Sequence, residues 1–139
     1  SPFLCLILNN SFPGDYQNAG WTVTNDQYTV QFAEFTMYAD LAAERVIAAQ
    51  RGKEKIAVEI KSFVKRSPVQ DVRDALGQYV MYRAYLAEIE PDRKLYMATS
   101  MRAYRDVFGL KAVEFLVQQF AIALIVVDIE REEVIRWIE

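Results

Sequence analysis

The residues best suited to chemistry lie in the segment Lys55–Lys61, which reads Lys-Ile-Ala-Val-Glu-Ile-Lys. Side chains alternate along a strand, so Ala57, Glu59 and Lys61 share one face and three β-branched residues share the other. A charge in such an apolar strand is costly unless it is paired, hydrated or bound to a metal. Glu59 and Lys61, with a second acid at Asp40 upstream, form the ligand set of a Mg²⁺-dependent phosphodiesterase.

A simpler interpretation of the same segment is structural. On a half-exposed strand, Glu59 and Lys61 would form the solvated face beside charged cross-strand neighbours. An acid, a spacer and Glu-x-Lys also occur together by chance in many α/β proteins. The motif alone therefore favours a structural strand, and other residues must decide between the two interpretations.

Two polar side chains follow in the next predicted element, a helix. Gln78 and Tyr82 are four residues apart, so they share one helix face. An amide can orient a lysine, a water molecule or a phosphate, and a phenol can donate to a phosphate. However, Tyr79, Tyr82 and Tyr85 recur at helical spacing, which is more typical of a packed core.

The composition excludes several classes of site. The 139 residues form a single predicted domain, and the net charge of −3 argues against a general nucleic-acid coat protein. The chain has no histidine, which excludes histidine triads and histidine zinc sites. Cys5 is the single cysteine, so we expect no internal disulfide, a buried packing role for Cys5 and a cytoplasmic protein. Metal chemistry would then need oxygen ligands, hence Mg²⁺ or Mn²⁺.

The charges are unevenly distributed along the chain. Residues 51–66 hold six Lys or Arg and two Glu, a local charge of +4, whereas the chain from Asp128 onward carries −3. A phosphate backbone would be drawn to the first region. An equally good interpretation is a solvated hairpin whose charges protect a sheet edge.

The order of periodic segments predicts an α/β fold with a mixed central sheet flanked by helices. Residues 1–20 form an atypical N-terminal segment, in which Phe3–Leu8 is too short to span a membrane. The β-rich half begins at Trp21. The predicted strands are Tyr28–Phe35 and Thr36–Asp40 (or one bent strand), Arg45–Gln50, Glu54–Phe63, Arg93–Ser100, Ile122–Asp128 and an edge strand Glu133–Ile138. The predicted helices are Pro68–Ile89, capped by Ser67 and stopped by Pro91, then Met101–Phe108 and Leu110–Phe120, split at Gly109.

Several blocks of this sequence, in order, resemble the XisH family, the fdxN element excision controlling factors of cyanobacteria. The blocks are Tyr-Ala-Asp-Leu-Ala-Ala-Glu from Tyr38, Ile-Ala-Ala from Ile47, Lys-Ile-Ala-Val-Glu-Ile-Lys-Ser-Phe from Lys55, Ala-Leu-Gly-Gln-Tyr from Ala75 and the ending Glu-Glu-Val-Ile-Arg-Trp-Ile-Glu from Glu132. The resemblance covers about residues 21–139 of the single domain 1–139. The family normally opens with an amphipathic helix, which residues 1–18 do not resemble.

The resemblance implies a restriction-endonuclease-like fold of the PD-(D/E)xK type. It places the core Asp on Asp40, the Glu-x-Lys on Glu59 and Lys61, and the Gln-x-x-x-Tyr of related nucleases on Gln78 and Tyr82. Mg²⁺ or Mn²⁺ would be held by Asp40, Glu59 and the carbonyl of Ile60. Asp40 follows Ala39 and not a proline, so the motif position has no literal Pro-Asp pair, and the different N-terminus lacks the helix that often supplies a further acid.

Two functions follow from the resemblance. The first is a DNA endonuclease in which Lys61 orients or deprotonates the attacking water. The second is a regulatory protein that binds XisI or DNA and controls excision by a separate recombinase without cutting. An open, hydrated cleft around Asp40, Glu59 and Lys61 would favour the nuclease, and a closed core in which Lys61 is salt-bridged would favour the regulator. We further expect the edge strand Glu133–Ile138, which ends in Trp137-Ile138, to contact XisI. We expect no membrane contact, and a homo-oligomer is compatible with the chain.

Overall fold

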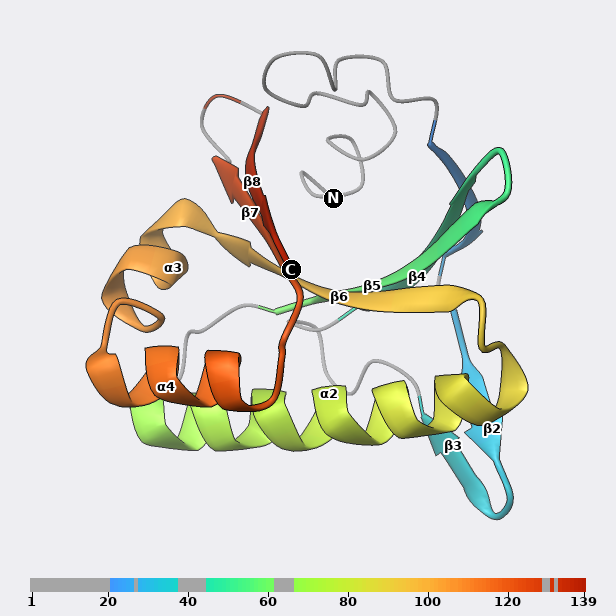
Figure 1. The fold of residues 1–139 in the computed structure, drawn as a ribbon, viewed down its shortest axis with the longest axis horizontal. Coiled ribbons are helices and arrows are strands. Elements are labelled where there is room, and N and C mark those ends of the chain that lie inside the picture. Colours follow the sequence, from blue (N-terminus) through green and yellow to red (C-terminus); the bar gives the residue numbers. More distant parts are fainter. Residues whose placement is uncertain (1–20, 27, 38–44, 62–66, 129–130, 132) are drawn as a thin grey trace.

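A six-stranded mixed sheet forms the centre of the computed structural model, which describes residues 21–26, 28–37, 45–61, 67–128, 131 and 133–139 (Figure 1). The strands are arranged in the order β1-β4-β5-β6-β7-β8, and β2 and β3 form a separate two-stranded sheet. The strands are β1 (Thr22–Asp26), β2 (Val30–Phe32), β3 (Phe35–Met37), β4 (Arg45–Arg51), β5 (Glu54–Ile60), β6 (Arg93–Ser100), β7 (Leu124–Asp128) and β8 (Glu133–Ile138). The described helices are α2 (Pro68–Ile89), α3 (Met101–Asp106) and α4 (Lys111–Gln119). The predicted α/β class with a mixed, helix-flanked sheet is confirmed.

The hairpin that presents β5 to the centre of the sheet is built as predicted. β4 and β5 pair antiparallel from Arg45 opposite Ile60 to Arg51 opposite Glu54. The two-residue turn between them places Gly52 at φ +58°, a conformation that glycine adopts without a steric cost. β5 then pairs parallel with β6, so it lies between two strands and is protected from the edge.

Helix α2 connects these two parallel strands and covers one face of the sheet. The side chain of Ser67 accepts a hydrogen bond from the backbone N–H of Gln70 (3.3 Å) and caps the helix, and Pro68 occupies its first turn. Its buried side chains recur every three or four residues, which is the spacing of one helix face: Asp71, Val72, Ala75, Tyr79, Tyr82 and Leu86. The backbone N–H of Glu90 bonds to the carbonyl of Leu86, and Pro91 follows, so the helix ends where the sequence predicted.

Alternation along β5 sorts its side chains between two cores. Ala57 belongs to the core beneath α2, which also holds Tyr79 and Tyr82. Ile56 and Val58 belong to the core on the opposite face of the sheet. Figure 1 shows α2 and α4 on the same side of the strongly curved sheet. The predicted split of side chains along this strand is therefore confirmed, and it places Glu59 and Lys61 beneath α2.

One predicted strand is wrong. Tyr28–Phe35 was expected to form one strand, but the chain turns at Ala33 and Glu34, and β2 and β3 form a short hairpin there. Ala33 adopts φ +51°, which glycine or asparagine adopts more readily. The predicted turn signals are absent at this point, which is why the sequence did not reveal it.

Other boundaries shift by a few residues. β5 is described to Ile60, β7 begins at Leu124, and the strand Thr22–Asp26 before Tyr28 was not assigned. Residues 62–63 of the predicted strand Glu54–Phe63 and residues 38–40 of the predicted strand Thr36–Asp40 lie outside the described residues. None of the helices in the described parts of the chain is long and apolar enough to cross a membrane.

Candidate functional site

Glu59 and Lys61 form a buried ion pair near the carboxyl end of β5. Glu59 lies opposite Val46 of β4 and Met97 of β6, with apolar neighbours on both sides. The Lys61 Nζ is 3.0 Å from the Glu59 Oε1, and the two side chains are only 4% and 1% exposed. A buried ion pair is costly to desolvate and is often no better for stability than apolar residues of the same volume. Its presence in the sheet is therefore weak evidence for a purely stabilising role.

The third member of this cluster comes from α2. The Lys61 Nζ donates a hydrogen bond to the Gln78 Oε1, so the ammonium bridges a strand carboxylate and a helix amide. The backbone N–H of Lys61 bonds to the carbonyl of Ala98 (3.0 Å), which fixes the end of β5 against β6. We refer to Glu59, Lys61 and Gln78 as the Glu59–Lys61–Gln78 cluster. The structure thus brings together three of the five candidate side chains that the sequence named.

Tyr82 lies on the same side of α2 but within the core. Its side chain is 2% exposed, and it belongs to the same apolar cluster as Tyr79 and Leu86. Tyr79 donates a hydrogen bond from its hydroxyl to the carbonyl of Leu95 (2.9 Å) and accepts one from the N–H of Ala123 (3.1 Å). Burial raises the pKa of Tyr79 above its ordinary value. Both tyrosines thus pack as the core interpretation of the sequence predicted.

Two further buried polar residues, Thr99 and Asp71, were not named from the sequence. Thr99 of β6 is fully buried on the same side of the sheet as Met97, next to the end of β5, and its Oγ1 has no hydrogen-bond partner among the described residues. Asp71 is a buried acid (7% exposed) in the first turn of α2. Leu95, Met97 and Thr99 are two residues apart along β6, so the alternation of side chains along a strand could have placed Thr99 on the same face of the sheet as Met97.

A metal centre at Asp40 lies outside the described residues. Within the described residues, no three Asp, Glu, Cys or His side chains are grouped as a metal site would require. The carboxylate of Glu59 and the carbonyl of Ile60 are hard oxygen donors of the kind that Mg²⁺ prefers. The donor type fits a divalent cation, but Glu59 already shares its carboxylate with the Lys61 ammonium.

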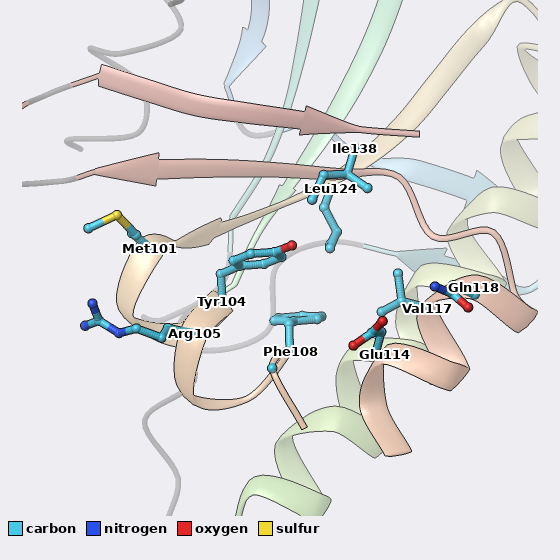
Figure 2. Close-up of a pocket in the computed structure, with 10 residues that line it drawn as sticks. Met101, Tyr104, Arg105, Phe108, Glu114, Val117, Gln118, Leu124 and Ile138 are labelled. Atoms are coloured by element: carbon cyan, nitrogen blue, oxygen red, sulfur yellow. The ribbon is translucent and has the colours of Figure 1, made fainter. Parts of the chain in front are cut away.

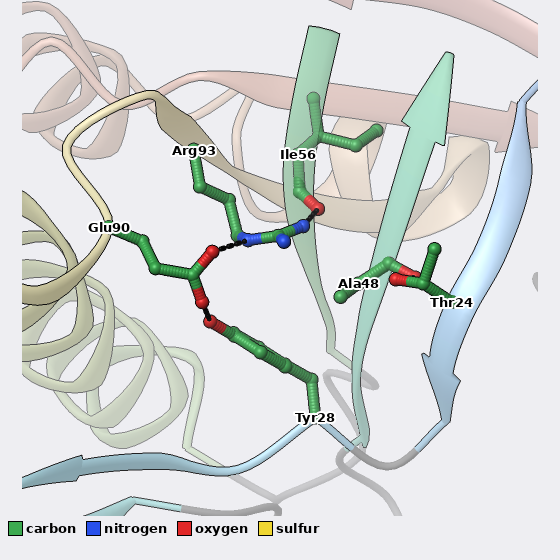
Figure 3. A network of polar contacts seen from close by, with 6 residues as sticks. All are labelled: Thr24, Tyr28, Ala48, Ile56, Glu90 and Arg93. Carbon is green, nitrogen blue, oxygen red and sulfur yellow. Dashed lines mark hydrogen bonds and ion pairs between the residues drawn. The ribbon is translucent and has the colours of Figure 1, made fainter. Parts of the chain in front are cut away.

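A second polar network lies at the C-terminal end of α2 (Figure 3). The Tyr28 hydroxyl donates a hydrogen bond to one oxygen of Glu90, and the Arg93 Nε donates to the other (2.9 Å). Arg93 also donates to the carbonyl of Ile56 (2.9 Å), and its guanidinium lies over the Tyr28 ring at 5.1 Å. We refer to Tyr28, Glu90 and Arg93 as the Tyr28–Glu90–Arg93 network. It connects the end of α2 to β5 and to the segment before β2.

The network shifts the ionisation of both acidic members. Burial and the neighbouring Glu90 carboxylate raise the pKa of Tyr28 to about 12. Burial alone would raise the pKa of Glu90, but the hydrogen bonds from Tyr28 and Arg93 outweigh it and hold that pKa below its ordinary value. Glu90 is therefore a carboxylate at neutral pH, and it acts as the acceptor of the network.

A groove of about 520 Å³ opens between α3, α4 and the ends of β7 and β8 (Figure 2). Its lining is mostly apolar, with Tyr104, Phe108 and Val117 toward its interior and the charges of Arg105 and Glu114 on the two helices. A smaller groove of about 340 Å³ lies between α2 and the start of β6. Neither lining, as far as the residues are described, includes the Glu59–Lys61–Gln78 cluster.

The basic region around the hairpin offers less free charge than the sequence suggested. Arg51 pairs with Glu54 at 3.1 Å and lies over the Trp21 ring at 4.7 Å, and Lys61 is buried in the cluster. Lys53 is exposed at the turn. The local charge of +4 is therefore partly neutralised within the fold, and Lys65 and Arg66 lie outside the described residues.

β8 is an edge strand of the sheet, as predicted. Its Trp137 is half-buried, meeting Tyr96 edge-on at 4.8 Å and stacking with Trp21 at 6.4 Å. Both edge strands show a register shift, in β1 between Val23 and Asn25 and at the pairing of β8 with β7. Such irregularities reduce the tendency of an edge to add a further strand.

Comparison with known proteins is consistent across sequence and structure. The family model described as XisH protein matches residues 10–135. The chain is similar to the crystal structure of an XisH family protein from Nostoc punctiforme PCC 73102, at 29% identity and a TM-score of 0.83, with 100% of both chains covered. It is also similar to the crystal structure of a fdxN element excision controlling factor protein from Anabaena variabilis, at 31% identity and a TM-score of 0.81, with 99% of this chain and 98% of that chain covered. No curated protein matches the chain.

Proposed function

Because the chain belongs to the XisH family, we propose that it is an excision controlling factor that acts by binding an XisI-like partner and DNA, without cutting DNA itself. The observation that carries this proposal is the closure of the Glu59–Lys61–Gln78 cluster. Both charged side chains of the pair are almost fully buried and contact each other at 3.0 Å. The expected compartment is the cytoplasm.

A closed cluster is poorly suited to phosphodiester hydrolysis. A lysine that stabilises charge on phosphorus must reach the phosphate, and the Lys61 ammonium is already engaged by Glu59 and Gln78. The same contacts suit a fixed structural role, since they hold the end of β5 against α2. The arrangement meets the criterion that favours a regulatory protein over a nuclease.

We propose β8 as the surface for the XisI-like partner. Its register shift disfavours strand addition, so the docking would use side chains. Trp137 packs on Tyr96, which means that Trp137→Ala would also disturb the fold. Arg136 is exposed on β8 and makes a sharper test.

The partner proposal is tested by co-purification of the two proteins. Arg136→Glu is expected to weaken capture of an XisI-like protein at least about tenfold, as for a disrupted interface anchor. The matched control is Lys53→Glu, a charge reversal of an exposed cation at the β4–β5 turn. Docking at β8 would be refuted if both variants weakened capture of the XisI-like protein equally, or if neither variant weakened it.

A Mg²⁺-dependent endonuclease is the second candidate, and the convergence of Glu59, Lys61 and Gln78 favours it. Catalytic hydrogen bonds often reach their final geometry only in the complex with substrate, so the geometry of the unliganded protein alone does not rule a candidate out. Asp40, Glu59 and the carbonyl of Ile60 would hold the metal, which would polarise a phosphate oxygen. Lys61 would orient or deprotonate the attacking water.

A cleavage assay separates the two candidates. Supercoiled, linear and branched DNA are incubated with Mg²⁺ or Mn²⁺ and with wild type, Lys61→Ala or the control Lys53→Ala. The regulatory proposal expects no cleavage that depends on Lys61. Cleavage lost in Lys61→Ala and retained in Lys53→Ala would establish the nuclease.

Metal binding gives a readout that does not depend on activity. For a dissociation constant of about 1 mM, roughly 10 mM Mg²⁺ would raise the free energy of unfolding by about 1.4 kcal/mol. Under the nuclease candidate, Asp40→Asn abolishes that increase. Under the regulatory proposal, wild type and Asp40→Asn respond equally to Mg²⁺.

A further inference from the structure

The outer side of α2 carries a stripe of exposed side chains that is uncharged in its centre. The stripe runs from Arg73 to Glu88, and its exposed positions are Arg73, Gly77, Val80, Met81, Ala84, Ala87 and Glu88. Val80 is 37% exposed and Met81 39% exposed, and both are large apolar side chains. Figure 1 shows α2 along the outer margin of the molecule, with its opposite side toward the sheet. We refer to these seven residues as the α2 outer stripe.

Gly77 is difficult to explain within a single copy of the chain. A glycine inside a helix destabilises it relative to alanine, because glycine loses more backbone freedom on folding. A Cβ added at Gly77 would meet no atom within 4 Å, and the residue has no positive φ. The isolated fold therefore gives no steric reason for glycine here, whereas a second helix packed closely against α2 would.

The α2 outer stripe is self-complementary about its centre. In an antiparallel pair of α2 helices with the two-fold axis between Val80 and Met81, Gly77 of one copy lies level with Ala84 of the other. Two small residues at matching levels permit the short helix separation of about 8–10 Å that close packing requires. Val80 and Met81 of one copy then contact the same two residues of the other copy near the two-fold axis, where apolar side chains are best shielded from water.

The charges at the ends of the stripe match in the same register. Arg73 and Glu88 lie at equal distances from the centre, each about 11 Å along the helix axis. The two-fold axis therefore brings Arg73 of one copy level with Glu88 of the other, twice per pair. In a parallel pair the two arginines would instead face each other, and so would the two glutamates.

From this match we propose that the chain forms an antiparallel homodimer through the α2 outer stripe. The pairing is isologous, the commonest arrangement in soluble homo-oligomers. A single helix pair buries less than the roughly 1,200 Å² of a standard stable interface, so the association is weak. The cluster beneath α2 is untouched by the pairing, so the dimer stands independently of the proposed function.

Sedimentation equilibrium of the purified chain from about 2 to 400 µM is the first test. The wild type is expected to show a reversible monomer–dimer equilibrium. Met81→Lys is expected to weaken the dimer at least about tenfold, because it places a lysine in the apolar centre. The matched control is Val69→Lys, an exposed apolar position of the same helix (65% exposed) outside the stripe, which leaves the dimer unchanged.

Charge reversal then tests the antiparallel register. Arg73→Glu and Glu88→Arg, each alone, place like charges level with one another and weaken the dimer. An equimolar mixture of the two variants restores opposite charges at both ends, so a heterodimer of wild-type affinity is expected. No rescue in the mixture would overturn the register.

Three outcomes would overturn the proposal itself. The first is a chain that stays monomeric to 400 µM. The second is a dimer that Met81→Lys leaves intact, which would place the interface elsewhere. The third is a monomeric chain whose capture of an XisI-like protein is abolished by Met81→Lys and not by Val69→Lys, which would show that a different partner covers the stripe.

Discussion

Two polar clusters contact α2, one at its middle and one at its C-terminal end, and each holds a carboxylate, a cation and a neutral hydrogen-bonding group. They differ in how far their charges are buried. In the Glu59–Lys61–Gln78 cluster, both charged side chains are almost completely buried. In the Tyr28–Glu90–Arg93 network, Arg93 is 8% exposed while Glu90 is 34% exposed, so water reaches the carboxylate. The network at the C-terminal end of α2 stabilises the end of the helix, whereas the attraction within the buried pair is offset by the cost of desolvating both charges.

The two clusters also differ in what they connect. Arg93 links Glu90 to the carbonyl of Ile56, and thereby the end of α2 to the start of β5. Lys61 links neighbouring positions of one strand to the middle of α2. The first arrangement joins distant segments, whereas the second fixes the carboxyl end of β5, where sites of α/β proteins commonly form.

The largest expected effect is that of Lys61→Met. The substitution takes the ammonium away from a carboxylate that is 1% exposed. Removing one partner of a buried ion pair costs about 3–5 kcal/mol, and we expect the free energy of unfolding in urea to fall by that amount. The double variant Glu59→Leu/Lys61→Met should recover wild-type stability to within about 1 kcal/mol. If Lys61→Met lowered the free energy of unfolding by less than about 1 kcal/mol, the Glu59–Lys61 pair would not be buried in solution.

A smaller loss is expected for Arg93→Ala. This variant removes hydrogen bonds to Glu90 and Ile56 and the contact with the Tyr28 ring. Since water can replace part of the interaction with Glu90, we expect the free energy of unfolding to fall by about 2 kcal/mol. Arg93→Lys, which retains the charge, should lose less. If Arg93→Ala costs more than Lys61→Met under the same conditions, the contrast between the two clusters is reversed.

Tyr28→Phe should cost about 1 kcal/mol, because it removes one hydrogen bond to a partly exposed carboxylate. The cost should depend on pH. The pKa of Glu90 is lowered in the fold, so its contribution is present above its unfolded pKa and is lost as the pH falls through the folded value. The pKa of Tyr28 is raised to about 12, so its contribution is present below about pH 10 and is lost as the pH rises toward 12. Urea unfolding of wild type and variant from about pH 3 to 11 checks this, and a constant difference across that range would contradict it.

The smallest effect is expected for Thr99→Val. The Thr99 Oγ1 is buried beside the cluster without a hydrogen-bond partner among the described residues. Replacing such a hydroxyl by a methyl group of the same shape should be neutral or stabilising by up to about 1 kcal/mol. Chemical denaturation checks the sign. A loss of more than about 1 kcal/mol would mean that the hydroxyl is satisfied within the folded protein.

Local signals made most of the fold predictable. Ser67 and Pro68 start α2 and Pro91 follows its end, and the alternation in β5 separates Glu59 from Val58. These features depend on residues close in sequence, where capping, turn chemistry and periodicity act. The turn at Ala33 was missed because neither of its residues is one that turns usually require.

The site was only partly predictable. Gln78 could be placed on the correct helix face, and its contact with Lys61 follows from α2 lying over β5. The burial of Lys61 and the pairing of Arg51 with Glu54 depend on tertiary packing, so the charge pattern alone overestimated the cationic surface. The Tyr28–Glu90–Arg93 network joins residues more than 60 positions apart and had no sequence signal.

Chemical labelling of lysines tests the closure of the Glu59–Lys61–Gln78 cluster most directly. Reductive methylation of the native protein, followed by mass spectrometry, measures how fast each ammonium reacts. Lys53 is exposed and Lys94 is 48% exposed, so both serve as references within the same sample. Lys61 is expected to react on the order of 100-fold more slowly than either reference, because labelling requires local opening. Labelling of Lys61 at the rate of Lys53 would contradict the closed cluster and, with it, the proposal that this chain controls excision without cutting DNA.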